Sequence, residues 1–334
     1  MKRWISLLCL AFAWVACSAD ESPQSTEVPA EAEISDNEQV LGRGEGKDQW
    51  WDALPRPAWA AFSKIEQSQP WFEVYEIRPE VYAIYEPGQF EEVISYLIVG
   101  NERALLFDTG LGIGDIRQLV GELTDREVFV LNSHTHYDHV GGNHAFDRVY
   151  GTDLEYTQVN ARGRSHVEVA EFVGDGWIWM ETPESFSAST YVSAPFTVTD
   201  IVSDGQVLDL GGVELEILLT PGHAPDALCL LDRQRRLIFT GDTFYPATLY
   251  AHLPGSTFDE YAATAERLAG LADAVDLVLP AHNEPTMPAR DLVALRDAFA
   301  AVRDPSTDFV LTDGNREYDF GRFSILVAEP PPWE

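Results

Sequence analysis

Cysteine is scarce in this chain of 334 residues, and its placement excludes a fold held together by internal disulfides. Cys9 and Cys17 lie close to the N-terminus, which leaves Cys229 alone in the body of the chain. One thiol cannot form an intramolecular disulfide. Because Cys229 lies in the apolar run 227–231, we expect a buried and inert thiol instead of a nucleophile.

Positive charge is also scarce. The chain has 22 Lys and Arg against 55 Asp and Glu, so its formal net charge is −33. A protein this acidic repels phosphate backbones and anionic lipid headgroups, which argues against nucleic acid and against membrane binding through a basic patch. Apolar residues nevertheless make up 45% of the chain, enough to build a substantial core.

Long hydrophobic runs are absent except at the N-terminus, where residues 1–19 have the pattern of a secretory signal peptide. Lys2 and Arg3 precede an apolar run at 4–16, which has the length of a signal-peptide hydrophobic region and is short for a membrane span. The sequence therefore predicts an exported protein.

The cleavage site of this signal has two interpretations. Residues 14–17 (WVAC) resemble a bacterial lipobox, in which Cys17 becomes the lipidated N-terminus, whereas ordinary cleavage would follow Ala19. We favour the lipoprotein because residues 18–40 carry seven acidic residues and no Lys or Arg. Such a segment cannot bury enough apolar surface to fold, so we predict a disordered tether at 20–47. The expected location is the periplasm, with an outer-membrane anchor if Cys17 is lipidated.

The remainder, residues 48–334, is predicted to form one globular domain. Strand-like apolar runs lie at 81–85, 93–99, 104–107, 128–131, 207–210, 213–219, 227–231, 237–240 and 277–279. Helical patterns lie at 113–123, 258–271 and 290–302. Groups of strands with helices outside them predict a layered α/β architecture.

Metal-binding residue types cluster directly after the predicted strand 128–131, as His134, His136, Asp138 and His139. In extended backbone, residues i and i+2 point to the same side, so His134 and His136 can bind one cation. Asp138 and His139 come where the chain turns and can face a second cation, and the two glycines at 141–142 let the backbone bend. Imidazole with carboxylate suits zinc, with iron and manganese as alternatives.

This H-x-H-x-D-H stretch resembles the signature of the metallo-β-lactamase superfamily. The resemblance covers residues 74–285 and includes four further motifs in order: LFDTG at 106–110, TPGH at 220–223, FTGDT at 239–243 and LPAH at 279–282. It implies an αββα sandwich, with two mixed β-sheets flanked by helices and the active site at one edge.

The resemblance also implies a site for two zinc ions per chain. The ligands implied for the first ion are His134, His136 and His223. Those implied for the second are Asp138, His139 and His282. Asp242 would bridge the two ions beside a bridging hydroxide, and Asp108 would orient a metal-bound histidine.

Tyr245 stands three residues after Asp242. In the acyl-homoserine-lactone lactonases of this superfamily, a tyrosine at that offset contacts the substrate carbonyl; a packing role is the alternative. The loop 86–92 and the segment 151–200 are candidate walls over the site. Two apolar walls would favour an apolar or amphipathic small molecule.

The function implied is that of an exported dinuclear zinc hydrolase. Its metal-bridging hydroxide would attack an ester, a lactone or a similar small-molecule substrate, with Asp138, Asp242 and Asp108 as carboxylates of the catalytic centre. Two alternatives stay open: a β-lactamase, and a mononuclear-iron oxygenase of the persulfide dioxygenase type. The sequence leaves the oligomeric state unspecified.

Overall fold

A computed structural model describes residues 49–333 of the chain. The predicted signal peptide at 1–19, with Cys17, and the predicted tether at 20–47 lie outside the described residues.

An eight-stranded sheet contains the first half of the fold, with its strands in sequence order from β1 to β8. The strands are β1 (Ser63–Ile65), β2 (Glu73–Arg78), β3 (Val81–Tyr85), β4 (Ile94–Val99), β5 (Arg103–Phe107), β6 (Glu127–Leu131), β7 (Val149–Gly151) and β8 (Asp200–Ile201). Neighbouring strands are antiparallel from β1 to β5 and parallel from β5 to β8. Every residue of β4 is buried, as expected for a strand covered on both faces.

A six-stranded sheet has the order β15-β14-β12-β11-β10-β9. Its strands are β9 (Val207–Asp209), β10 (Glu214–Leu219), β11 (Leu228–Asp232), β12 (Leu237–Gly241), β14 (Leu277–Pro280) and β15 (Met287–Pro288). A third sheet, of four strands, has the order β13-β18-β17-β16. Its strands are β13 (Thr248–Tyr250), β16 (Val310–Thr312), β17 (Asn315–Asp319) and β18 (Ser324–Val327).

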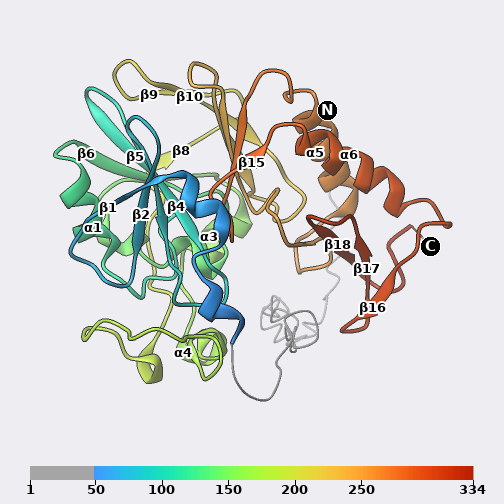
Figure 1. Cartoon of the computed structure of the whole chain (residues 1–334), viewed down its shortest axis with the longest axis horizontal. Coiled ribbons are helices and arrows are strands. Elements are labelled where there is room, and N and C mark those ends of the chain that lie inside the picture. Colours follow the sequence, from blue (N-terminus) through green and yellow to red (C-terminus); the bar gives the residue numbers. More distant parts are fainter. Residues whose placement is uncertain (1–48, 334) are drawn as a thin grey trace, which may run out of the picture. The chain divides into compact units, whose positions relative to one another are not determined.

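Helices cover the outer faces of the two larger sheets (Figure 1). The α-helices are α1 (Ile116–Leu123), α2 (Tyr137–Val140), α3 (Glu155–Asn160), α4 (His166–Val169), α5 (Phe258–Ala269) and α6 (Asp291–Val302). Short 3₁₀ helices are η2 (Trp50–Ala53), η3 (Pro57–Ala61), η4 (Asn143–Ala145), η5 (Glu171–Val173) and η6 (Ala188–Thr190).

Three hydrophobic clusters define the layers. The central cluster joins the inner faces of the two larger sheets, and there Phe239 of β12 packs edge-on against Tyr96 of β4 at a ring distance of 5.2 Å. A second cluster packs α1 against the outer face of the first sheet. The third packs α5 and α6 against the outer face of the second sheet and against the third sheet. This is the predicted αββα arrangement of two mixed sheets between helices.

The predicted strands and helices are confirmed, with small shifts at their ends. The helix predicted at 113–123 begins at Ile116, because the Asp115 side chain accepts a hydrogen bond from Gln118 N at 2.9 Å and caps the helix there. The third sheet was not predicted. Two residues of β16, Val310 and Leu311, are exposed, and β17 has one buried residue, Tyr318, so no alternating apolar pattern marks them as strands.

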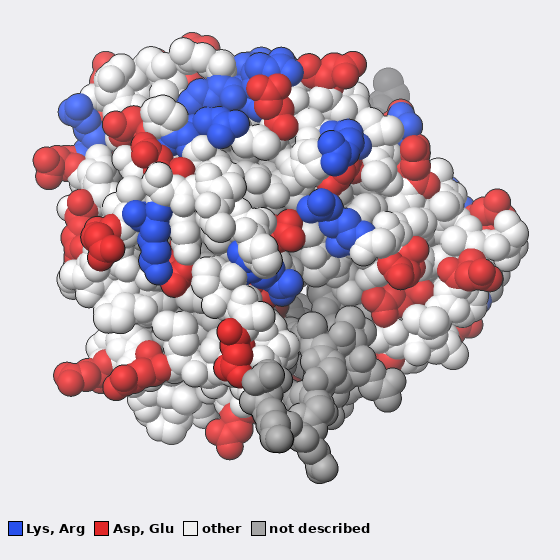
Figure 2. Space-filling view, viewed as in Figure 1, with Lys and Arg blue, Asp and Glu red and all other residues white. Residues whose placement is uncertain are grey.

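Cys229 is buried as predicted, and burial raises the pKa of its thiol to about 11. On the face drawn in Figure 2, carboxylates are spread widely, while Lys and Arg gather mainly in the upper part of the view. Among the described residues, no helix combines the length and the apolar character needed to span a bilayer.

The central cluster predicts a contrast between two leucines. Leu230 of β11 is fully buried in it, whereas Leu311 of β16 is 66% exposed. We expect Leu230→Ala to lower the free energy of unfolding by about 2–5 kcal/mol, because it leaves a cavity between the sheets. The control, Leu311→Ala, should change it by no more than about 0.5 kcal/mol. Urea unfolding followed by tryptophan fluorescence measures both, and equal losses would contradict the assigned core.

Candidate metal centre

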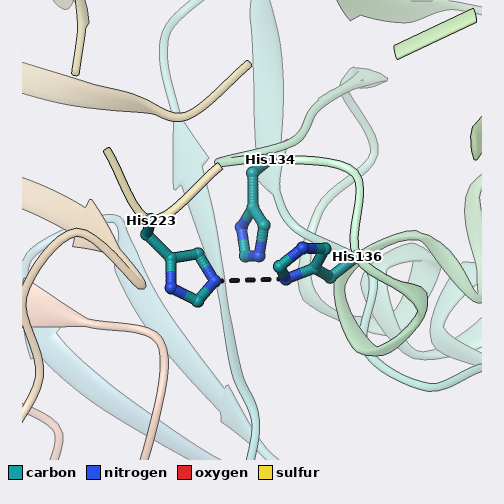
Figure 3. A group of neighbouring side chains, drawn as sticks. All are labelled: His134, His136 and His223. Carbon is teal, nitrogen blue, oxygen red and sulfur yellow. Dashed lines mark hydrogen bonds between the residues drawn. The ribbon is translucent and has the colours of Figure 1, made fainter. Parts of the chain in front are cut away.

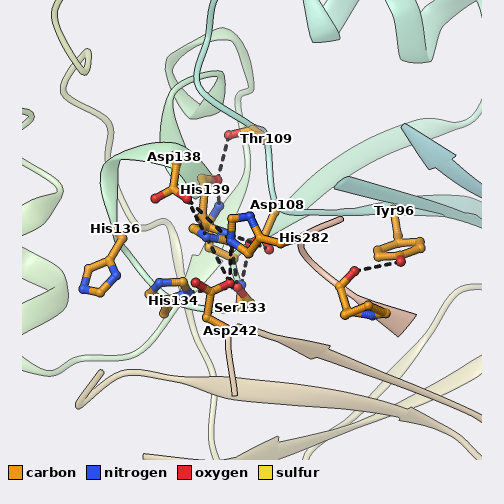
Figure 4. A network of polar contacts seen from close by, with 12 residues as sticks. Tyr96, Asp108, Thr109, Ser133, His134, His136, Asp138, His139, Asp242 and His282 are labelled. Atoms are coloured by element: carbon orange, nitrogen blue, oxygen red, sulfur yellow. Dashed lines mark hydrogen bonds and ion pairs between the residues drawn. The ribbon is translucent and has the colours of Figure 1, made fainter. Parts of the chain in front are cut away.

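The predicted ligands meet because they follow strands that end at the same edge of the two larger sheets. Asp108 follows β5, and His134 to His139 follow β6. From the second sheet, His223 lies in the loop after β10, Asp242 follows β12, and His282 follows β14. Figure 4 shows these side chains, except His223, around one centre. Segments that are far apart in the sequence therefore build a single site.

Three overlapping groups of side chains have ligand atoms within 4.8 Å of one another. They are His134, His136 and His223; His134, His139 and Asp242; and Asp138, His139 and His282. Figure 3 shows the rings of the first group turned toward one another. All these residues are buried. The first and third groups are the two ligand sets that the family resemblance implies.

Two imidazoles are oriented by a partner on the side away from this centre. His139 Nδ1 lies 3.0 Å from Asp108 Oδ2, as predicted for Asp108. His282 Nδ1 lies 2.6 Å from the carbonyl oxygen of Glu91, and because a carbonyl can only accept, this nitrogen carries the proton. In both rings Nε2 is the nitrogen that faces the centre, and it offers a lone pair to a cation that displaces its proton.

His136 is oriented the other way round. Its Nε2 lies 2.8 Å from the hydroxyl oxygen of Tyr156 in α3, while its Nδ1 lies 3.1 Å from His223 Nε2. Nδ1 is therefore the nitrogen that faces the first ligand group, and it offers a lone pair to a cation in the tautomer in which Nε2 donates to the Tyr156 hydroxyl. Residue spacing could not predict Tyr156, because no local pattern links α3 to the H-x-H-x-D-H stretch twenty residues earlier.

The unpaired atoms of the site fit a bound cation. His134 Nε2, His139 Nε2 and Asp242 Oδ1 are buried without a hydrogen-bond partner. Asp242 Oδ1 is 2.9 Å from His282 Nε2 and 3.3 Å from His139 Nε2, but these contacts are not aligned as hydrogen bonds. Unpaired buried polar atoms are costly, and a cation that accepts their lone pairs removes that cost. Nitrogen and carboxylate donors suit zinc and similar divalent ions.

Burial sets the protonation of the first ligand group. It lowers the pKa of His136 to about 4 and that of His223 to about 3, and it lowers the pKa of His134 well below its usual value. These three rings are neutral at pH 7, which is the state that binds a metal. The pKa of His282 is raised to about 9: burial lowers it, but the nearby carboxylate of Asp242 outweighs that effect.

The backbone beneath the site is locally strained. Asp108 has a φ of +66°, a left-handed conformation that non-glycine residues rarely adopt, and its Oδ1 accepts a hydrogen bond from Ser133 N at 2.6 Å.

Gly141, by contrast, has a helical φ of −58°. Gly141 and Gly142 lie in a turn, as predicted, but Gly141 makes this turn without a positive φ. A Cβ there would lie 2.2 Å from the backbone of Leu111, so the residue is needed for close approach.

A cavity of about 590 Å³ opens over the ligands. Phe90 and Glu91 from the loop 86–92 line it beside Asp138 and Asp242, so the structure places this predicted loop at the site. Burial raises the pKa of the Glu91 carboxyl to about 7, and Tyr137 donates a hydrogen bond to it. The Trp177 ring packs against Phe90, and the Trp179 ring packs against Trp50 and Trp51. Neither Trp177 nor Trp179 lines the cavity.

Tyr245 lines the same cavity. Its ring centre lies 5.0 Å from that of His282, and its hydroxyl donates to the carbonyl oxygen of Thr248 at 2.5 Å. The ring therefore packs beside the ligands, and the predicted contact with a substrate carbonyl stays a prediction. His144 and His166 lie outside the ligand groups and bond to the backbone oxygens of Gly141 and Tyr191.

Comparison with known proteins identifies a family match over most of the chain. The model of the metallo-beta-lactamase superfamily matches residues 90–314, which include every predicted ligand and the third sheet as far as Gly314.

Several curated relatives are named as thioesterases. The human protein named acyl-coenzyme A thioesterase MBLAC2 is 32% identical over 212 residues, which cover 59% of this chain and 75% of that protein. A protein from Aspergillus fumigatus named atrochrysone carboxyl ACP thioesterase is 27% identical over 179 residues, covering 51% of this chain and 47% of that protein.

Solved structures share the fold. A metallo-beta-lactamase family protein from Thermus thermophilus aligns with a TM-score of 0.50 and 21% identity, over 68% of this chain and 81% of that one. The sec-alkylsulfatase Pisa1 from Pseudomonas sp. aligns with a TM-score of 0.52 and 19% identity, over 68% of this chain and 41% of that one. At these identities the likeness concerns the fold alone.

The hydrogen bond between Tyr156 and His136 predicts a loss of metal affinity when the hydroxyl is removed. We expect Tyr156→Phe to bind Zn²⁺ roughly tenfold more weakly, because the His136 ring loses the partner that orients it. Competition with a chromophoric chelator measures this affinity. Tyr75→Phe, which removes a hydroxyl bonded to Glu73 on β2, is the matched control and should bind as the wild type does. Unchanged affinity in Tyr156→Phe would show that the contact does not position His136.

Proposed function

The chain belongs to the metallo-β-lactamase superfamily and is a hydrolase, and from this premise we propose that it is an exported dinuclear zinc enzyme that cleaves acyl esters, with acyl thioesters as the first candidates. The names of the human and Aspergillus relatives support the thioester. Thioesters, oxoesters and lactones share an electrophilic acyl carbon, so the proposal keeps the substrate class expected from the sequence.

The position of Asp242 carries the proposal of two metals. Its Oδ2 lies 3.6 Å from His223 Nε2, on the side of the first ligand group. Its Oδ1 lies 2.9 Å from His282 Nε2 and 3.3 Å from His139 Nε2, on the side of the group with Asp138. One carboxylate thus faces two separate ligand sets, which is the arrangement that a bridging ligand requires.

The side chains around the cavity would bind and orient the substrate. Divalent cations, when bound here, would supply Lewis acidity and a water with a pKa near 7. Phe90 and Trp50 contribute apolar side chains to the wall of the cavity. Burial, with the nearby Asp242 carboxylate, holds the pKa of Tyr245 well above its usual value, so its phenol keeps its proton. That proton is donated to Thr248 O, so a contact with a substrate carbonyl requires Tyr245 to exchange this partner.

Export is supported by the sequence of residues 1–19, with their basic start and apolar run. The proposed location is the periplasm, with attachment to the outer membrane through lipidated Cys17. Cells grown with radioactive palmitate should yield labelled wild-type protein and unlabelled Cys17→Ala protein. That result would support a lipid anchor on Cys17.

A substrate screen tests the proposed function. Zinc-loaded protein should hydrolyse acyl thioesters faster than nitrocefin, aryl esters, lactones and sulfate esters, and it should contain two zinc ions per chain. Faster turnover of nitrocefin would favour the β-lactamase alternative. A single iron per chain, with oxygen consumption on a persulfide substrate, would favour the oxygenase.

The bridging role predicts the effect of removing one carboxylate. Asp242→Ala should lower kcat by at least about a hundredfold and should reduce the zinc content, while the circular dichroism spectrum stays that of the wild type. Asp273→Ala, which removes an exposed carboxylate outside the site, is the control and should keep both activity and zinc. Full turnover by Asp242→Ala would exclude the proposed dinuclear mechanism.

A further inference from the structure

The cavity continues beyond the metal centre to a wall that the third sheet builds. Thr248 of β13, Glu317 and Asp319 of β17, and Ser324 of β18 line it together with Asp138 and Asp242. A substrate whose scissile bond lies at the ligands therefore extends its remaining atoms toward this sheet. The charge on this wall decides which groups it can accept.

The positive charges in the cavity are already engaged. Among the described residues that line it, Arg56 and Arg322 are the basic side chains outside the histidines. Arg56 Nη2 lies 2.5 Å from Glu92 Oε1, and Glu92 is fully buried, so withdrawing Arg56 would leave a buried carboxylate uncompensated. Arg322 pairs with Glu284 at 3.1 Å and with Asp291 at 3.4 Å. Both guanidinium groups are therefore already paired with carboxylates of the chain.

The negative charges on the third sheet are not compensated in this way. Glu317 accepts hydrogen bonds from the hydroxyls of Ser324 at 2.6 Å, Thr312 at 2.7 Å and Thr248 at 3.2 Å, which fix its carboxylate at the wall. Asp319 accepts one from Gly321 N at 2.7 Å. Within the described part of the chain, neither carboxylate has a Lys or Arg partner within 4.0 Å.

The remaining lining is largely apolar. Trp50, Phe90, Leu253, Val310 and Phe323 all contribute to the cavity. Apolar side chains bind hydrocarbon without regard to charge, so they supply affinity for an acyl group. They supply nothing that could offset the repulsion of an anion by Glu317 and Asp319. The chain's net charge of −33 adds a long-range repulsion of the same sign.

We infer that the substrate is an acyl thioester or ester whose leaving group bears no phosphate, and that Glu317 and Asp319 exclude phosphorylated carriers such as coenzyme A. This inference rests on the proposed function and narrows it. The human relative is named for acyl-coenzyme A. The bond cleaved would be of the same kind, while the carrier would be neutral or positively charged.

Two thioesters with the same acyl chain test the inference. The probes are octanoyl-coenzyme A and octanoyl-N-acetylcysteamine, assayed with the zinc-loaded full chain at low ionic strength. We expect kcat/KM to be at least about tenfold higher for the neutral N-acetylcysteamine thioester. Added NaCl should narrow this ratio, because salt screens the repulsion between exposed charges.

A charge-reversal variant of the cavity wall provides a second test. Asp319→Lys should shift the preference several-fold toward octanoyl-coenzyme A. The matched control, Glu214→Lys, changes the net charge equally at an exposed position of β10 outside the cavity, and should leave the preference unchanged. Because Asp319 is exposed and forms a single turn contact, folding of its variant is expected and is checked by circular dichroism.

The possible outcomes distinguish a failure of this inference from a failure of the proposed thioesterase function. Equal or better hydrolysis of octanoyl-coenzyme A by the wild type would overturn the exclusion of phosphorylated carriers and leave thioester hydrolysis standing. An equal shift in Asp319→Lys and Glu214→Lys would overturn the role of the cavity wall. Failure to hydrolyse either thioester would overturn the proposed thioesterase function and the inference with it.

Discussion

The structure depends on one constraint: buried imidazole and carboxylate groups converge at one edge of two sheets and leave several of their atoms without a hydrogen-bond partner. Orphaned atoms such as His134 Nε2 and Asp242 Oδ1 would be costly in an interior that contained no cation. The sandwich must therefore hold them in place, because side chains left free would turn to water. The packing of Phe239 against Tyr96 between the sheets is part of that support, since it joins the sheets whose strands carry ligands at their ends.

The residues that surround the ligands determine which atoms face the centre. Asp108, the Glu91 carbonyl and Tyr156 each occupy the outer nitrogen of one imidazole. The left-handed backbone at Asp108 is the conformational cost of placing its carboxylate between Ser133 N and His139 Nδ1. Orientation here comes from three different kinds of partner in three different parts of the chain, so it is a property of the assembled fold.

The third sheet gives the cavity a character of its own. The ligand sets explain why a hydrolase can work here, but they are common to a superfamily and do not select a substrate. The fixed carboxylate of Glu317 and the engaged guanidinium of Arg56 bring selectivity by charge. The metal ligands thus come from the two larger sheets, whereas the residues proposed to select the substrate come mainly from the third sheet.

Local apolar runs in the sequence predicted a layered α/β architecture, four of the eight strands of the first sheet, five of the six strands of the second sheet, and the helices α1, α5 and α6. The αββα class and the ligand set from His134 to His282 were implied by the resemblance of five short motifs to one family. The sequence could not identify β16 and β17, because both carry exposed residues without such a pattern. The partnership of Tyr156 with His136 and the arrangement of the cavity wall were decided only by tertiary structure. They join residues twenty or more positions apart, and no local periodicity records which of those residues will meet.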